Sequence, residues 1–462
     1  MSRRVRVVMR KSNRGGRLLV GLLAVVGFLA VSLGGGSGAA AASKAAALTL
    51  PIPTFAQACG NKPITLQGYF ESGFPDIVDL TAAFTKQYPS VKWKVTLDPF
   101  ATITQDAALV LGGPNPPDLI RLPILVGLVK DHLLLNLNSY FEAYHWNTWP
   151  ASEWAQNRTS ANGVGLGSGN IYAWGLNNQV TGVFYNKALA AKIGMKNAPT
   201  TLAALEADFA KAKAAGITPI DVFNGGSTGG LVFPLQQLMA DYSSATAINN
   251  WVFYKAGANI DTSADVQAAT VLQKWIQAGY FNPDANAVLY AQMMSDFDAG
   301  QALFIFDGDW ESGGFDTNEP GKIGFFPMPP LKAGGPVAAM SGPLQYGIAA
   351  HAEYPNCTAF FLNWVSTNKT ARAINVKIGG SNPGGPASLP IPTVKPGSTT
   401  SQTLAAGLVV AKDNGDMDFI ANANGSIYAE GWTPEVQKLF AGRETPQGLL
   451  HTVQADYVAE GS

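Results

Sequence analysis

The sequence predicts an α/β protein with two lobes, each a mixed sheet flanked by helices. A short apolar strand at Ile64–Phe70, a helix with one apolar face and an alternating strand at Val91–Leu97 follow one another. Strands that are joined through a helix in this way pair in parallel. The same construction starts again after Thr201, and a length of 462 residues exceeds a single hydrophobic core.

The start of the chain is typical of a secretory signal peptide. Residues 1–42 contain seven basic and no acidic residues, the apolar run Leu18–Leu33 and the small residues Ala39–Ala42. The apolar run is shorter than the roughly 20 residues that a membrane span needs. We therefore expect export of the protein, cleavage near Ala42, and a flexible tether over residues 43–62.

Composition excludes several classes of function. Without the signal peptide, 24 basic residues face 32 acidic ones, so the net charge is near −8 and nucleic acid is an unsuitable partner. The histidines never occur at helical spacing, so we expect neither a metal site nor a cofactor: His132, His145, His351 and His451.

In the first lobe, a second helix at Thr104–Leu111 is followed by a third strand, which opens with Pro116–Ile120. Ligands of doubly wound sheets bind outside the carboxyl ends of the strands. This rule predicts that three loops face a cleft: Glu71–Phe74, Asp98–Phe100 and Arg121–Pro123.

The segment Ile171–Lys187 predicts a passage from one lobe to the other. An apolar strand at Ile171–Trp174 is interrupted by Asn177-Asn178-Gln179, and extended structure restarts at Val183. Beyond it, the second lobe is predicted from a helix capped by Thr201, a strand at Ile217–Phe223, and a helix, strand and turn between Met293 and Trp310.

Several blocks of the sequence, in order over about residues 62–460, resemble one family. They are Ala83–Pro89 before the second strand, Gly112-Gly113 with Pro116-Pro117-Asp118, Phe184-Tyr185-Asn186-Lys187, Gly308 with Trp310, and Lys322–Pro330. These blocks resemble the extracellular solute-binding proteins of ABC importers, specifically the sugar-binding, maltose-binding-protein-like group.

The resemblance implies two lobes joined by three crossings, which form a hinge and close on a small carbohydrate. It divides the chain into lobe 1, residues 63–176 and 345–385, and lobe 2, residues 177–344 and 386–462. It further implies a monomer that is not an enzyme and that delivers its ligand to the permease subunits of an ABC transporter.

The resemblance also implies ligand-binding residues. Sugars present an apolar face and a rim of hydroxyls, which an aromatic platform with carboxylates and amides complements. Matching positions are Gln179, Asp309, Trp310 and Trp432, with Trp174 beside the first crossing; weaker candidates from loop position are Glu71, Asp98, Arg121, Asn178, Asn224 and Asp307. Any one of these aromatic residues could instead belong to the core.

An alternative function is a secreted serine hydrolase. Gly225–Gly229 satisfies Gly-x-Ser-x-Gly between a predicted strand and helix, which would make Ser227 the nucleophile. A short motif arises readily by chance in a chain with 50 glycines, and this one has no adjacent acid. The loop is therefore interpreted as a lining of the cleft.

Cys59 and Cys357 are the two cysteines of the sequence. Cys59 precedes the first strand and Cys357 begins a helix that should return to the same lobe, so a disulfide is expected. Two free thiols and a lipid anchor on Cys59 are the alternatives, although the apolar run of the signal ends well before Cys59.

Overall fold

The computed structural model describes residues 51–460. The predicted signal peptide and its cleavage near Ala42 lie outside these residues. Within them, no helix combines the length and the apolar character that crossing a membrane requires.

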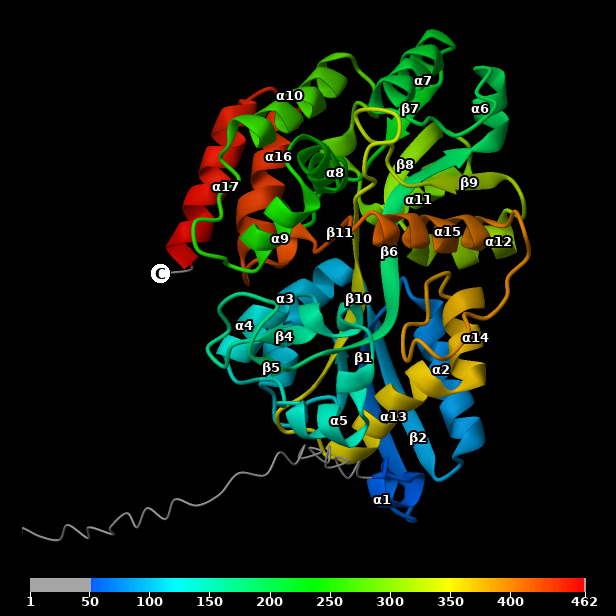
Figure 1. Ribbon diagram of the computed structural model, residues 1–462, viewed down its shortest axis with the longest axis vertical. Helices are drawn as coiled ribbons and strands as arrows, with labels where there is room; N and C mark the ends of the chain where they lie inside the picture. Colours follow the sequence, from blue (N-terminus) through cyan, green and yellow to red (C-terminus); the bar gives the residue numbers. More distant parts are fainter. Residues whose placement is uncertain (1–50, 461–462) are drawn as a thin grey trace, which may run out of the picture. The chain divides into compact units, whose positions relative to one another are not determined.

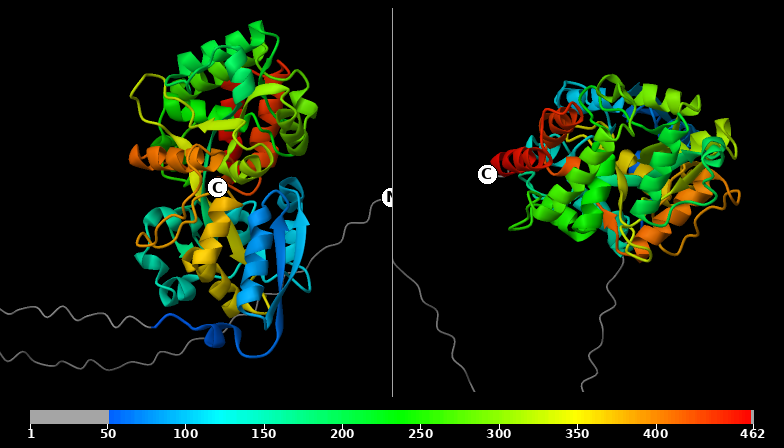
Figure 2. Two further views of the ribbon diagram at one scale, coloured as in Figure 1. Left: turned by 90° about the vertical axis from the view of Figure 1, so that its right-hand side faces the viewer. Right: turned by 90° about the horizontal axis from the view of Figure 1, so that it is seen from above.

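The described elements form two groups that are joined by two long strands (Figure 1). Strands β6 (Trp174–Asn186) and β10 (Ala339–Ile348) pair with each other and run from one group into the other, as a second view also shows (Figure 2). The sheet order is β2-β1-β3-β10-β6-β8-β7, with β9 beside β6 and β11 beside β10. The shorter partners are β3 (Leu119–Arg121), β7 (Thr218–Asp221), β8 (Ala302–Gly308), β9 (Ile323–Phe326) and β11 (Asp416–Met417), while β4 (Arg158–Thr159) and β5 (Asn170–Ile171) form a separate pair.

The first group is built on the predicted strand–helix–strand unit. Strand β1 (Ile64–Glu71) pairs in parallel with β2 (Val91–Asp98) on one side and with β3 on the other. The side chains of Leu66 and Phe70 project from the same face of β1 and pack in one core with Phe84 and Phe361. The helices of this group are α2 (Pro75–Gln87), α3 (Phe100–Leu111), α4 (Leu125–Lys130), α5 (Asn138–Ala143), α13 (Pro355–Thr367) and α14 (Lys369–Lys377).

The second group repeats the construction around β7 and β8, which are also parallel. Thr201 caps α7 as predicted, since its hydroxyl accepts a hydrogen bond from the Ala204 amide at 3.2 Å. The helices of this group are α6 (Lys187–Lys192), α7 (Leu202–Ala214), α8 (Val232–Tyr242), α9 (Ala245–Val252), α10 (Ser263–Gln277), α11 (Tyr290–Asp298), α12 (Ser312–Asn318), α15 (Thr399–Lys412), α16 (Thr433–Phe440) and α17 (Pro446–Glu460).

The predicted polar interruption of the passage between the groups is absent from β6. The strand continues through Asn178 and Gln179, which are register partners of Pro343 and Gly342 of β10. Antiparallel pairing with β10 thus holds this stretch extended, whatever the polarity of its side chains. The prediction of a broken strand was wrong because the sequence pattern contains no information about the distant partner strand.

The segment 51–62, expected to be a tether with little structure, contains helix α1 (Phe55–Cys59). Thr54 and Gln57 form a capping box at its start, and the ring of Phe55 stacks on Tyr88 at 4.2 Å. Cys59 is joined to Cys357 by a disulfide, which leaves no thiol on Cys59 for a lipid. The short helix is therefore fixed to the start of α13.

Candidate functional site

The carboxyl ends of β1 and β3 bring together an ion pair. Arg121 Nε lies 3.2 Å from Glu71 Oε2, and each side chain is 14% exposed. The Arg121 guanidinium also lies over the ring of Phe100, 5.4 Å from its centroid. Burial raises the pKa of the Glu71 carboxyl, although the charge of Arg121 opposes this shift. The first lobe thus presents a charged pair and an aromatic face at its strand ends.

Trp310 occupies the corresponding position on the second lobe, directly after β8. It is partly buried, and its indole lies 6.3 Å from the ring of Phe74 on the first lobe and 6.4 Å from Phe233 on α8. Its Nε1 donates a hydrogen bond to Tyr290 Oη at 2.9 Å. These contacts hold the aromatic surface in one orientation between the two lobes.

Gly308 is required for that orientation. A Cβ atom at this position would lie 1.8 Å from a ring carbon of Trp310, much closer than any real contact. The indole therefore lies directly against the backbone at the end of β8.

We expect Gly308→Ala to weaken ligand binding about tenfold, because the added methyl group must displace the Trp310 ring. Calorimetric titration of ligand into the variant and the wild type checks this. Gly314→Ala is the matched control, because a Cβ at Gly314 meets no atom within 4 Å. Equal affinities for the wild type and Gly308→Ala would show that the ring position does not matter for binding.

Tyr290 connects two carboxyl groups beside Trp310. Its Oη lies 2.9 Å from Asp307 Oδ2 and 2.7 Å from Glu311 Oε1. Burial, and then the charge of Glu311, raise the pKa of Asp307 well above its usual range. Burial also raises the pKa of Glu311 to about 7. The turn after β8 is thus an acidic and aromatic surface, of which Trp310, Glu311 and Tyr290 remain partly exposed.

Asp309 does not belong to that surface, contrary to the expectation from the sequence. It is buried, and its Oδ1 accepts a hydrogen bond from Ser381 Oγ at 3.0 Å. Ser381 lies on the segment after α14, so Asp309 anchors this segment to the turn. Burial raises the pKa of Asp309 well above its usual range, and the charge of Asp76 adds to the shift.

Asp76 lies at the start of α2, where its Oδ2 accepts a hydrogen bond from Asn177 Nδ2 at 3.3 Å. Its Oδ1 is buried and has no hydrogen-bond partner among the described residues. Burial raises the pKa of Asp76 to about 7. Burial makes this carboxylate costly to ionise, and hydrogen bonds from the Ile77 backbone and from Asn177 offset only part of the cost, so the carboxyl retains its proton above the usual pH range.

We expect Asp76→Asn to raise the free energy of unfolding at pH 8 by about 1–3 kcal/mol, with little effect near pH 4. The folded-state pKa of about 7 exceeds the ordinary 3.8, so the folded chain binds more protons than the unfolded chain between these values. Ionisation therefore lowers wild-type stability as pH rises through this window, whereas the amide does not ionise. Urea unfolding at both pH values measures the difference, and an equal effect at both would contradict it.

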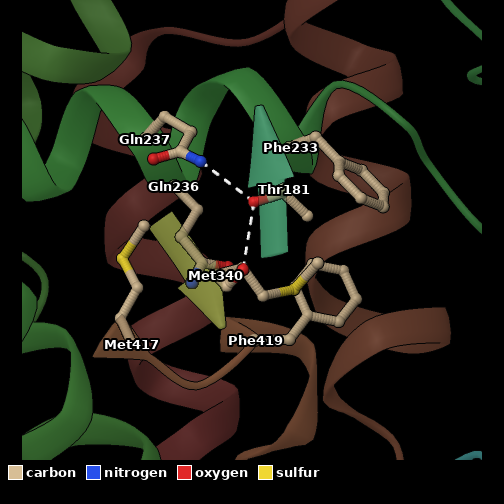
Figure 3. A pocket seen from close by; sticks show the side chains of 7 residues that line it. All are labelled: Thr181, Phe233, Gln236, Gln237, Met340, Met417 and Phe419. Carbon is tan, nitrogen blue, oxygen red and sulfur yellow. Dashed lines mark hydrogen bonds between the residues drawn. The ribbon is translucent and has the colours of Figure 1, made fainter. Parts of the chain in front are cut away.

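A narrow pocket continues from Phe233 into the second lobe (Figure 3). It is too narrow to admit a water molecule, and its walls include Met340, Met417 and Phe419. Thr181 is the hydroxyl in this pocket, and it accepts a hydrogen bond from Gln237 and donates one to the Met340 carbonyl. A ligand cannot enter so narrow a gap, so the gap belongs to the packing of the second lobe.

Two tryptophans that were predicted to bind ligand belong to the core instead. Trp174 is 1% exposed and stacks on Trp146 at 3.9 Å. Trp432 is fully buried and packs on Trp251 at 5.8 Å. Both predictions were wrong, because the elements that carry these residues pack inward against helices and turns distant in sequence.

The polar candidates divide in a similar way. Asp98 is the register partner of Glu71 and lies at the same edge of the sheet. Asn178 and Gln179 lie on β6, where Asn178 Nδ2 donates a hydrogen bond to Glu153 at 2.7 Å and the buried Gln179 Nε2 has no hydrogen-bond partner among the described residues. Asn224 is fully buried and bonds to Asn286, so its role is structural. The structure therefore brings Glu71, Asp98 and Arg121 together on one lobe. On the other lobe Asp307 lies beside Trp310 but is fully buried, like Asp309, and its oxygens accept hydrogen bonds from Tyr290 and the Gly308 amide.

Four residues of the site were not singled out from the sequence: Phe74, Phe233, Tyr290 and Glu311. Phe74 belongs to a loop that was expected to face the cleft, and Glu311 directly follows Trp310. Their positions in the sequence could therefore have indicated that both belong to the site. Tyr290 and Phe233 begin helices far from the turn in sequence, and nothing local indicates that they reach Trp310. In residues 51–460, no group of three or more His, Cys, Asp or Glu could hold a metal ion.

Two α/β lobes that share long strands, with an aromatic and polar surface where they meet, define the class of two-lobed solute-binding proteins. The profile of the family described as bacterial extracellular solute-binding protein matches residues 67–372. The chain belongs to this family, whose members bind solutes and are not enzymes. The serine-hydrolase alternative is therefore set aside. The backbone carbonyl of Ser227 accepts a hydrogen bond from the Thr433 hydroxyl.

Solved structures share the fold at low sequence identity. A chitin-oligosaccharide-binding protein is 18% identical, with a TM-score of 0.69 over 87% of this chain and 100% of that one. RafE in complex with raffinose is 16% identical, with a TM-score of 0.66 over 86% and 100%. Maltose-bound MalE3 of T. maritima is 16% identical, with a TM-score of 0.67 over 86% and 99%. No curated protein matches the sequence.

Proposed function

We propose that the protein captures a small carbohydrate between its two lobes and delivers it to the permease subunits of an ABC transporter. The observation that carries the proposal is the partly exposed indole of Trp310, which Gly308 and Tyr290 hold beside Glu311. An indole face complements the C–H face of a sugar ring, and carboxyl and phenol groups beside it complement the hydroxyl rim.

The opposite lobe supplies the second half of such a site. Phe74 faces Trp310, and the Glu71–Arg121 pair offers both an acceptor and donors for hydroxyl groups. A ligand contacted from both sides favours the closed arrangement of the lobes, because only that arrangement makes all the contacts. The named ligands of the related structures, which include raffinose and maltose, support a carbohydrate as the solute.

The proposal also includes three crossings of the chain between the lobes, export of the protein and its action as a monomer. Besides β6 and β10, the segment between α14 and α15 would form the third crossing, and Ser381 in this segment bonds to Asp309 of the turn. The proposed lobes are residues 63–176 with 345–385, and 177–344 with 386–462. Two shared strands and one tethered segment would limit the motion of the lobes to a hinge.

The test is a thermal-shift screen of the purified protein against mono- and oligosaccharides, followed by calorimetric titration of the best ligand. X-ray scattering with and without that ligand should show a smaller radius of gyration in the bound state. Saturable binding of a sugar with such a change supports the proposal. A screen in which amino acids or peptides stabilise the protein and no sugar does would refute it.

A further inference from the structure

Two buried carboxyl groups lie where the lobes are joined, one on each lobe. Asp76 begins α2 of the first lobe, Asp309 directly follows β8 of the second lobe, and each is 2% exposed. Helices α2 and α14 pack together and lie below α12 of the second lobe in Figure 1. Neither carboxyl group forms an ion pair within residues 51–460.

Asp309 holds two connecting segments to the second lobe. Its Oδ1 accepts a hydrogen bond from Ser381 Oγ at 3.0 Å, in the segment after α14 that is the proposed third crossing. It also accepts a hydrogen bond from the Val180 backbone of β6. The neighbouring Ser312 hydroxyl donates to the Gly380 carbonyl at 3.2 Å and strengthens the first of these attachments.

Asp76 contacts the same two segments from the first lobe. Its Oδ2 accepts a hydrogen bond from Asn177 of β6 at 3.3 Å. A Cβ atom at Gly379 would lie 2.7 Å from the same oxygen, so the backbone of the proposed crossing lies directly against this carboxyl group. Because β6 and residues 379–381 are contacted by one carboxyl group from each lobe, a hinge motion must change at least one set of these contacts.

The groups around the two carboxyl groups do not supply a positive charge. The titratable groups whose charges couple to them are Asp79 on α2, Asp307 on β8 and the Tyr346 hydroxyl on β10. On α14, Lys369 and Lys377 are exposed, and Arg372 donates to the backbone carbonyls of Ser366 and Leu389. If both carboxyl groups were ionised, two like charges would therefore act on each other across the junction of the lobes without a counter-ion.

We propose that Asp76 and Asp309 form a pH-sensitive contact between the lobes, which holds the lobes together while both carboxyl groups are protonated and separates them when the groups ionise. This inference rests on the proposed hinged, two-lobed function and adds a means of regulating it. On separation the two protons pass to the solvent, and water enters to hydrate the two carboxylates.

The direction of the pH dependence follows from the two arrangements. In the joined lobes burial raises the pKa of Asp76 to about 7, whereas a hydrated carboxyl group has the ordinary value of 3.8. The joined arrangement therefore binds more protons between these values. A rise in pH through this window favours separation by up to about tenfold per pH unit for Asp76 alone. Burial also raises the pKa of Asp309, so its contribution has the same sign.

The test measures the radius of gyration of the free protein by X-ray scattering at steps from pH 5 to pH 9. For the wild type we expect a reversible increase on the order of 1 Å as the pH rises, in a radius of roughly 22 Å. Far-ultraviolet circular dichroism should stay constant, because the lobes separate without unfolding. The Asp76→Asn, Asp309→Asn double variant should stay compact at every pH, since an amide keeps a hydrogen-bond acceptor and does not ionise.

Asp241→Asn is the matched control. Asp241 lies on α8 within the second lobe, burial raises its pKa to about 7, and one of its oxygens is buried without a hydrogen-bond partner among the described residues. It thus resembles Asp76 in all but its position between the lobes. The control should expand with pH as the wild type does.

Each outcome decides the proposal. A wild-type radius that does not change with pH, or a double variant that expands like the wild type, would overturn it. If the double variant fails to fold, Asp76→Asn alone should lessen the expansion, and an undiminished expansion would count against the pair. The scattering measurement needs no ligand, so pH-dependent expansion of a protein that binds no sugar would refute carbohydrate binding and leave the pH-sensitive contact intact.

Discussion

Replacement of Trp310 by alanine is expected to weaken ligand binding by roughly 2–4 kcal/mol, which is about 30- to 1000-fold in dissociation constant. The indole supplies the apolar platform of the second lobe, and its loss also removes the donor that orients Tyr290. Stability should change less than for a core tryptophan, whose truncation costs about 3–5 kcal/mol, because Trp310 is only partly buried.

Calorimetric titration of the best ligand and urea unfolding of both proteins test this expectation. Trp154→Ala is a suitable control, because Trp154 is also partly buried but packs on Phe141 and Arg158 within the first lobe. The control should bind ligand normally. If Trp310→Ala binds normally yet unfolds much more easily, Trp310 serves the core and the site is misplaced.

Removal of the Cys59–Cys357 disulfide is expected to lower the free energy of unfolding by about 2–5 kcal/mol. The two cysteines are 298 residues apart, so the bridge closes a very long loop in the unfolded chain and strongly restricts its conformational freedom. The affinity for ligand should stay the same, because the bridge joins α1 to the start of α13 and does not contact the residues around Trp310.

The measurement compares urea unfolding of the wild type and the Cys59→Ser, Cys357→Ser double variant, each with and without reductant. Reductant should destabilise the wild type toward the variant and leave the variant unchanged. Coincident unfolding curves for the oxidised wild type and the variant would show that the bridge contributes no stability.

Local sequence patterns were sufficient for the first lobe and for half of the site. The alternation at Val91–Leu97 and the helical spacing before it gave the parallel unit, and the rule about strand ends then placed Glu71 and Arg121 side by side. Trp310 was predicted from the resemblance to the family, which carries a Gly-x-Trp turn after this strand. In each case the signal and the structure that it specifies lie within a few residues.

The failures have a common physical cause. Whether an aromatic residue faces a ligand or a core depends on the elements that cover it, and Trp174 is covered by Trp146 from a distant segment. The same holds for β6, which stays extended because β10 pairs with it, and for Tyr290, which reaches Trp310 from the start of α11. Tertiary partners decide these positions, and a single sequence contains no direct record of them.

The place of β10 in the sheet has a consequence for biosynthesis. β10 lies between β3 and β6, although it is made more than 150 residues after both of them have begun to emerge from the ribosome. Neither strand can reach its final neighbour until residues 339–348 have been synthesised, and the first lobe's core also waits for Phe361. The growing chain thus carries an incomplete sheet with exposed strand edges through most of translation, and these edges stay open to aggregation until β10 pairs with them.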